Sequence, residues 1–244
     1  MISPERLQNT VQFPEYLKPF IDNLDDLVNI NESVYGLRPN IDEQKRDALA
    51  KKRTLLIITG FSGAGKDSAV RKLMEIDSRF GLVKTCTTRS TIRPDELEFD
   101  PYIRLTEEQF DEALKNGDVI ESNGYSGGRY CSLTSKFEDI FDNFEIPILR
   151  IDPSGTRFYI DKWKNDKLFF NNTNLITVFI ATPSVDVLGE RLKKRPGTDS
   201  DEVAKRLERV NIDISYLRDA EYIAINETDK LEKMVLNIQK IISS

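Results

Sequence analysis

The sequence feature that most constrains the fold is the run Gly60-Phe61-Ser62-Gly63-Ala64-Gly65-Lys66, which has the pattern G-x-x-x-x-G-K. It follows an apolar run expected to form a strand, Thr54 to Thr59, and it opens an amphipathic segment expected to be a helix, Lys66 to about Ser78. Glycines let backbone N–H groups turn inward around a phosphate, and the lysine reaches its β- and γ-oxygens. The alternative is a turn that only caps a helix. The flanking elements favour a phosphate-binding loop for ATP or GTP.

The loop departs from the usual motif at one position. Asp67 stands where Ser or Thr normally offers a hydroxyl to magnesium. A carboxylate is a harder and more charged oxygen ligand, so it could hold the ion directly, but without the ion it would repel the phosphates. We expect a working site in which Asp67 is a ligand of Mg²⁺.

From Arg53 onward, apolar runs expected to be strands alternate with amphipathic segments expected to be helices. The further expected strands are Ile146 to Ile151, Ile176 to Ala181 and Tyr222 to Asn226. A capping box of Thr106 and Gln109 predicts a helix ending at Gly117, and Pro183 and Ser184 open another. Two more helices are expected over 201–217 and 229–242. This alternation predicts an α/β domain with a largely parallel sheet and helices on both faces.

Residues 1–50 differ in character from the rest of the chain. They contain scattered prolines and Asn-rich stretches, with weak helical patterning in Tyr16 to Ile30 and Asp42 to Ala50. We treat them as an N-terminal extension, expected to be helical, that precedes a domain over 51–244.

Composition excludes several classes of function. The 244 residues contain no histidine, which removes histidine bases, histidine triads and histidine-ligated zinc. The net charge of -6 argues against a nucleic-acid partner, and the apolar runs are too short to cross a membrane. The two cysteines lack paired spacing, and the N-terminus lacks a signal or transit pattern, so a cytoplasmic protein with reduced thiols is expected. The remaining chemistry suits phosphoryl transfer.

A second motif indicates a family. Thr85-Cys86-Thr87-Thr88-Arg89, followed by Arg93 and Glu96, resembles the guanylate kinases, and the resemblance runs from about Thr54 to the C-terminus. It implies a P-loop kinase fold with a mainly parallel sheet flanked by helices. It also implies a small subdomain for the nucleoside monophosphate, about residues 85–135, and a mobile helical lid, about residues 190–207.

The acceptor site needs cations for a phosphate and groups that match guanine. Arg89 and Arg93 can supply bidentate guanidinium contacts, although alone they could be a solvated basic loop. The resemblance adds two tyrosines beside the phosphate and four groups that read the base: Tyr102, Tyr130, Glu121, Ser132, Thr85 and Asp152. Guanine presents donors at N1 and N2 that a carboxylate accepts, whereas adenine presents an acceptor at N1. This pattern favours GMP over AMP.

The resemblance also implies a lid and a contact with adenine. Arg191, Arg195 and Arg206 correspond to arginines that close over the triphosphate, and Asn226 corresponds to a residue near the adenine. Converging cations stabilise the charge of a transferring phosphoryl group. The alternative is the solvated face of two charged helices.

Several positions depart from the family pattern. The acceptor loop has one extra residue between Arg89 and Arg93, and Phe99 and Pro101 replace the usual Gly and Asp before Tyr102. Arg150 stands where the first of two strand carboxylates usually lies, which leaves only Asp152, and Cys131 stands where Gly is usual.

The expected activity is transfer of the γ-phosphoryl group from Mg-ATP to GMP or dGMP. The residues expected to act in catalysis are Lys66, Arg89, Arg195 and Arg206. Two alternatives stay open. The Lys-Asp ending of the loop resembles ribose 1,5-bisphosphate phosphokinases, and the departures would also fit a binding module that holds a phosphorylated protein. The expected state is a monomer or dimer.

Overall fold

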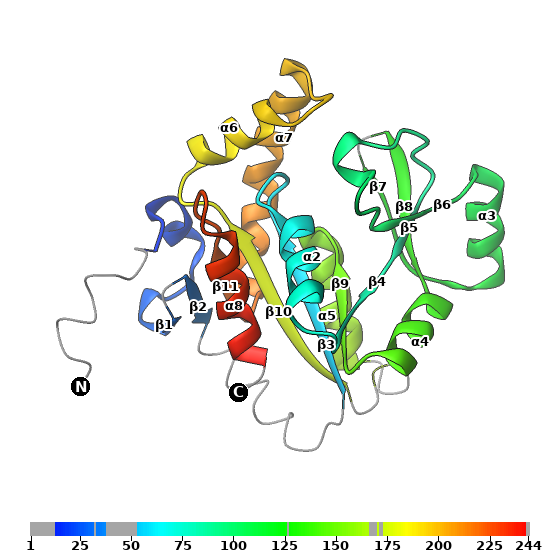
Figure 1. Ribbon diagram of the computed structural model, residues 1–244, viewed down its shortest axis with the longest axis horizontal. Helices are drawn as coiled ribbons and strands as arrows, with labels where there is room; N and C mark the ends of the chain where they lie inside the picture. Colours follow the sequence, from blue (N-terminus) through cyan, green and yellow to red (C-terminus); the bar gives the residue numbers. More distant parts are fainter. Residues whose placement is uncertain are drawn as a thin grey trace.

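The computed structural model describes residues 13–31, 33–37, 53–125, 127–165, 170 and 173–242. Its main sheet has seven strands in the order β1-β2-β11-β10-β3-β9-β4 (Figure 1). The five strands on one side of this order are parallel, which confirms the expected parallel sheet. They are β3 (Arg53–Gly60), β4 (Phe80–Val83), β9 (Ile146–Arg150), β10 (Thr173–Ala181) and β11 (Tyr222–Ile225).

Both faces of the central strand β3 are buried, and this explains its continuous apolar run. Leu56 and Ile58 belong to the core under α2 (Lys66–Ile76) and α8 (Leu231–Ile242). Leu55 and Ile57 face the other way, into a core completed by α4 (Thr134–Asn143) and α5 (Pro153–Asn165). Alternate residues of a strand point to opposite faces, so a strand covered on both sides is apolar at every position.

A second sheet forms the subdomain expected to bind the acceptor. Its order is β6-β5-β8-β7, with bounds Tyr102–Arg104, Thr85–Thr87, Gly128–Leu133 and Val119–Tyr125 respectively. A short 3-10 helix, η4 (Pro94–Glu96), lies between β5 and β6. Helix α3 (Glu107–Asn116) begins at the predicted capping box of Thr106 and Gln109, and it ends at Gly117, whose φ of 74° is left-handed.

Two helices form the part expected to be the lid. Helix α6 (Val185–Lys194) begins after Ser184, whose side chain accepts a hydrogen bond from the Val187 amide. Helix α7 (Ser200–Asp213) is shorter than the predicted 201–217, because a 3-10 helix, η5 (Ile214–Asp219), follows it. These helices lie to one side of the loop that precedes α2, and the small sheet lies to the other (Figure 1). Within the described ranges, no helix is long and apolar enough to span a membrane.

The N-terminal segment differs from the expected helix. Two short 3-10 helices, η2 (Glu15–Phe20) and η3 (Leu24–Asp26), precede a hairpin of β1 (Leu27–Asn31) and β2 (Val34–Leu37). Strand β2 pairs antiparallel with β11, so the segment extends the main sheet. The helical expectation for Asp42 to Ala50 lies outside the described residues.

Candidate active site

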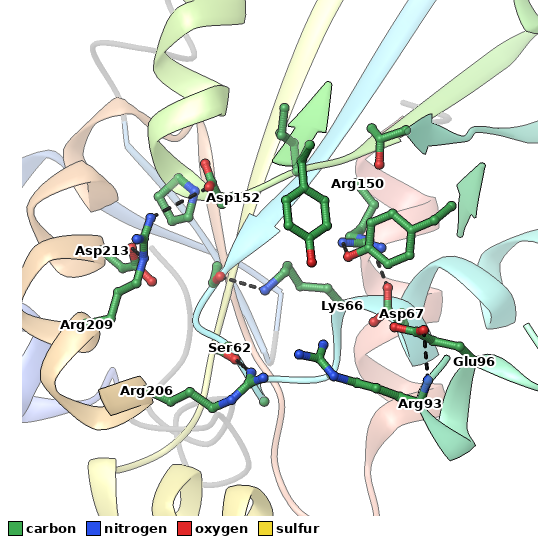
Figure 2. A pocket seen from close by; sticks show the side chains of 18 of the residues that line it. Ser62, Lys66, Asp67, Arg93, Glu96, Arg150, Asp152, Arg206, Arg209 and Asp213 are labelled. Carbon is green, nitrogen blue, oxygen red and sulfur yellow. Dashed lines mark hydrogen bonds and ion pairs between the residues drawn. The ribbon is translucent and has the colours of Figure 1, made fainter. Parts of the chain in front are cut away.

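A cleft of about 420 Å³ opens where the phosphate loop, the end of β9, the small sheet and helices α6 and α7 meet. Figure 2 shows labelled side chains of the phosphate loop, the acceptor loop, the end of β9 and α7 pointing toward one another. Most of the residues that we expected to form the site line this cleft: Gly60, Ser62, Gly63, Gly65, Lys66, Asp67, Thr85, Arg93, Tyr102, Glu121, Tyr130, Asp152, Arg191, Arg195 and Arg206. Five others lie behind this lining: Phe61, Ala64, Arg89, Ser132 and Asn226.

The phosphate loop is shaped by close backbone packing. Gly60 has a φ of 128°, and a Cβ there would lie 2.1 Å from the carbonyl oxygen of Ile180 on β10. Phe61 and Ala64 direct their side chains into the core. Only glycine combines this backbone conformation with such an approach. The glycine pattern in the sequence therefore has a direct structural cause at this position.

Lys66 is folded back over its own loop. Its Nζ donates to the carbonyl oxygens of Gly60 and Phe61, at 2.8 and 2.9 Å. Burial lowers the pKa of Lys66 to about 8. An anion that replaced these carbonyls as the partner of Nζ would favour the charged ammonium.

The first residue after the lysine makes an unexpected ion pair. Oδ1 of Asp67 lies 2.9 Å from Nε of Arg150, at the end of β9 (Figure 2). Arg150 is largely buried, and its Nη1 donates to the Tyr102 hydroxyl at 2.8 Å. Although burial opposes its charge, Asp67 and Tyr102 raise the pKa of Arg150, so the guanidinium stays charged.

This ion pair does not fit the expectation that Asp67 is a metal ligand. A guanidinium 2.9 Å from the carboxylate would repel a dication, and the pair would have to separate before Asp67 could bind one. Among the described residues, no group of three or more acidic, histidine or cysteine side chains is placed to hold a metal ion. In this structure the Asp67 carboxylate is engaged by Arg150, and its role as a magnesium ligand stays a prediction.

The two arginines of the acceptor loop differ in their surroundings. Arg93 lines the cleft, where one of its Nη atoms lies 3.6 Å from Glu202 on α7. Arg89 is buried behind it, ion-paired with Glu96 and bonded to the Tyr130 hydroxyl at 3.2 Å. Arg104 shares Glu96 at 2.7 Å. In this arrangement Arg89 shapes the loop and orients Tyr130, and Arg93 faces the cleft.

Guanidinium groups gather on the lid side of the cleft. Burial lowers the pKa of Arg93, and repulsion from Arg195, Arg206 and Arg89 lowers it further. Arg206 donates to the Ser62 hydroxyl of the phosphate loop and to Glu202. Arg191 donates to the carbonyl oxygen of Asn226 at 2.9 Å. Such a concentration of cations in a partly desolvated cleft is suited to several anionic groups at once.

The residues expected to read the base lie on the opposite wall. Burial raises the pKa of Glu121 to about 7, and the charge of Asp152 contributes. Asp152 accepts hydrogen bonds from Ser154 and the amide of Gly155 and, more weakly, from Asn123, which holds its carboxylate in place. Ser132 on β8 is buried and lies opposite Glu121 on β7 in the small sheet.

An ion pair that lines the cleft, Arg209 with Asp213, was not predicted from the sequence. Arg209 and Asp213 are one turn apart on α7, with Nε of Arg209 3.2 Å from Oδ1 of Asp213. Nη2 of the same Arg209 lies 3.7 Å from Oδ2 of Asp152. The sequence shows that Arg209 and Asp213 are four residues apart, but an ordinary ion pair on the surface of a helix has the same spacing. Only the fold, which places Arg209 of α7 near Asp152 after β9, brings this pair to the cleft.

Comparisons with known proteins agree with this geometry. The guanylate kinase family model matches residues 52–244. A guanylate kinase of Mesomycoplasma hyopneumoniae (strain 7448) is 31% identical over 193 residues, which are 79% of this chain and 95% of that protein. One of Chlorobium luteolum is 29% identical over 192 residues, 78% of this chain and 93% of that protein. The crystal structure of a guanylate kinase from Anaplasma phagocytophilum has a TM-score of 0.56 and 20% identity, and the match covers 80% of this chain and 86% of that one.

Proposed function

The chain belongs to the guanylate kinase family, and from this premise we propose that it transfers the γ-phosphoryl group of ATP to GMP or dGMP. The observation that carries the proposal is the pairing of walls in one cleft. The phosphate loop and lid arginines form one wall, and a sheet carrying Glu121, Tyr102 and Tyr130 forms the other. A donor triphosphate and an acceptor monophosphate would therefore face each other.

Positioning and charge neutralisation account for the chemistry. Lys66 would exchange its two loop carbonyls for phosphate oxygens of ATP, and Arg195 and Arg206 would approach the transferring group from the lid. The acceptor phosphate is already anionic near neutral pH, so no general base is needed to activate it. Cations held in place before the reaction stabilise the charge of the transition state without reorganising.

Glu121 supports the choice of guanine. The Glu121 carboxylate would accept from the N1 and N2 donors of guanine, and Asp152 and Thr85 line the same cleft. With adenine the carboxylate would meet the N1 acceptor and stay unpaired. Leaving a buried polar group without a partner produces large discrimination between substrates.

Two finer points are part of the proposal. Magnesium would enter bound to phosphate oxygens of ATP and to water, which is its usual state in such sites. A cytoplasmic location is supported by the composition and by two cysteines that are both free and buried.

The test is ADP formation from Mg-ATP with GMP, dGMP, AMP, UMP and ribose 1,5-bisphosphate offered separately. We expect turnover with GMP or dGMP, little with AMP or UMP, and none in Lys66→Ala. Turnover with ribose 1,5-bisphosphate alone would replace the acceptor and keep the fold. If no acceptor gave turnover and ATP did not bind, the proposal would fail in favour of a protein-binding module.

A further inference from the structure

Three residues from different parts of the chain form one connected group beside the acceptor side of the cleft. Asp67 lies in the first turn of α2, Arg150 at the end of β9, and Tyr102 at the start of β6. The guanidinium is 2.9 Å from the Asp67 carboxylate and 2.8 Å from the Tyr102 hydroxyl, and its Cζ is 4.6 Å from the centre of the Tyr102 ring. The phosphate loop and the small sheet are thus joined through one side chain.

The direction of the hydrogen bond fixes what the tyrosine can do. Nη1 of Arg150 donates, so the hydroxyl oxygen of Tyr102 accepts and its own hydrogen is left to point elsewhere. Burial raises the pKa of Tyr102, so the hydroxyl keeps that hydrogen at neutral pH. Tyr102 lines the cleft, with its ring 5.5 Å from that of Tyr130. A cation that donates to a hydroxyl also makes it a stronger donor.

The partner of Arg150 explains its orientation. Nε and Nη2 of Arg150 have no hydrogen-bond partner among the described residues, so the contact of Nε with Asp67 is an ion pair without hydrogen-bond geometry, and Asp67 is the acid paired with this guanidinium. The Asp67 carboxylate is therefore the anion that balances this buried charge. The Arg150 side chain is 11% exposed and that of Asp67 is 45% exposed, so removing Asp67 would leave the more buried guanidinium without this anion, and we expect the position of Arg150 to depend on Asp67.

We infer that Asp67 and Arg150 are positioning residues for the acceptor: together they hold the Tyr102 hydroxyl so that it donates to the phosphate of the nucleoside monophosphate. The inference rests on the proposed function. It assigns Asp67, which lies in the ATP loop, to the acceptor site instead of to a metal ion. The inference also accounts together for two departures described in the sequence analysis, Asp67 in the phosphate-loop motif and Arg150 in the family pattern, because each needs the other for this role.

The test compares binding of GMP with binding of guanosine, which lacks the phosphate, by calorimetry without ATP. Arg150→Met and Tyr102→Phe should each weaken GMP binding about ten- to hundred-fold, as expected for loss of a hydrogen bond to a charged group, and should change guanosine binding less than about two-fold. Because Arg150 acts through the hydroxyl, the double variant should bind GMP about as weakly as the weaker single variant. Losses that multiply in the double variant would overturn the inference.

Asp67→Asn separates the two roles of Asp67. It should weaken GMP binding as Arg150→Met does and change guanosine binding much less, since the amide keeps the shape and loses the charge that holds Arg150. The opposite result, weaker Mg-ATP binding with GMP binding intact, would restore the metal ligand and overturn the inference. Should Arg150→Met fail to fold, Tyr102→Phe and Asp67→Asn still decide the question.

The control is Arg157→Met on α5, because Arg157 also forms an ion pair, with Asp219 at 2.6 Å, but away from the cleft. It should change neither GMP nor guanosine binding. The proposed function is judged separately, from turnover of the unaltered protein. Turnover with GMP and equal GMP affinity in Arg150→Met would overturn the inference alone. Absence of GMP binding by the unaltered protein would overturn the proposed function.

Discussion

The side-chain amide of Asn226 donates a hydrogen bond of 2.7 Å to the carbonyl oxygen of Ala64, so the end of β11 supports the phosphate loop. The same amide nitrogen would lie 2.4 Å from a Cβ at Gly65. Asn226→Ala should leave the loop carbonyl without this partner and lower the free energy of unfolding by about 1 to 3 kcal/mol. Urea denaturation measures this, and ATP affinity should fall in parallel. Unchanged values of both would show that Asn226 does not support the loop.

Gly60 is the loop position least tolerant of a side chain. Gly60→Ala would place a Cβ 2.1 Å from the Ile180 carbonyl oxygen at a φ of 128°. Backbone strain and overpacking together should destabilise the fold by about 3 kcal/mol or more. Gly124→Ala is the control, because a Cβ there meets nothing within 4 Å. Thermal unfolding should separate the two variants, and similar melting temperatures would contradict the prediction.

ATP binding should weaken as the pH rises through 8. Burial lowers the pKa of Lys66 to about 8, and phosphate oxygens favour its charged form. Below pH 8 the ammonium is already charged, whereas above it ATP must bind together with a proton. The affinity should fall about ten-fold per pH unit well above the pKa. Calorimetry between pH 7.5 and about 9.5 tests this. The side chain in Lys66→Gln has no titrating ammonium. This variant should bind ATP weakly, and its ATP affinity should not fall with pH in this way.

GMP binding should tighten as the pH rises through 7. The pKa of Glu121 is raised to about 7, first by burial and then by Asp152, so the carboxyl is protonated in much of the free protein at pH 6. Only the carboxylate can accept from both guanine donors, so binding must release that proton at low pH. The phosphate of GMP also titrates near this range. In Glu121→Gln, the pH dependence of GMP binding comes from the phosphate alone. The difference between the pH profiles of GMP affinity for the unaltered protein and for this variant should have its midpoint near pH 7.

The N-terminal hairpin should belong to the same cooperative unit as the sheet. Val34 on β2 is fully buried in the main core and pairs with Ala224 on β11. Val34→Ala should lower the free energy of unfolding by about 2 kcal/mol in one transition. The control is Asn29→Ala on the exposed part of β1. A separate early transition in the Val34 variant would show that the hairpin unfolds independently.

The sequence predicted the central fold well, because its signals there are local. A glycine pattern between a strand and a helix marks the phosphate loop, and Thr106 with Gln109 marks the start of α3. The N-terminal strands were missed for the opposite reason. Strand β2 pairs with β1 and also with β11, which is far away in sequence, and strand preference depends strongly on such neighbours.

Within the site, the sequence predicted residue types better than their partners. Arg89 was expected at the acceptor phosphate, but in the structure Glu96 engages it. Whether Arg89 reaches the substrate remains a prediction. The pairing of Asp67 with Arg150 joins positions 83 residues apart and depends on β9 lying beside β3. A family pattern marks such positions as departures, and only the fold shows that they contact each other.

The ion pair between Arg93 and Glu202 joins the acceptor loop to α7 across the cleft at 3.6 Å. These residues belong to the two parts between which a substrate would enter and a product would leave. Both side chains are partly exposed, so dissolved salt screens their attraction. Separating these two parts would separate two opposite charges, so we expect the rate at which the molecule admits and releases its ligands to depend on the ionic strength of its surroundings.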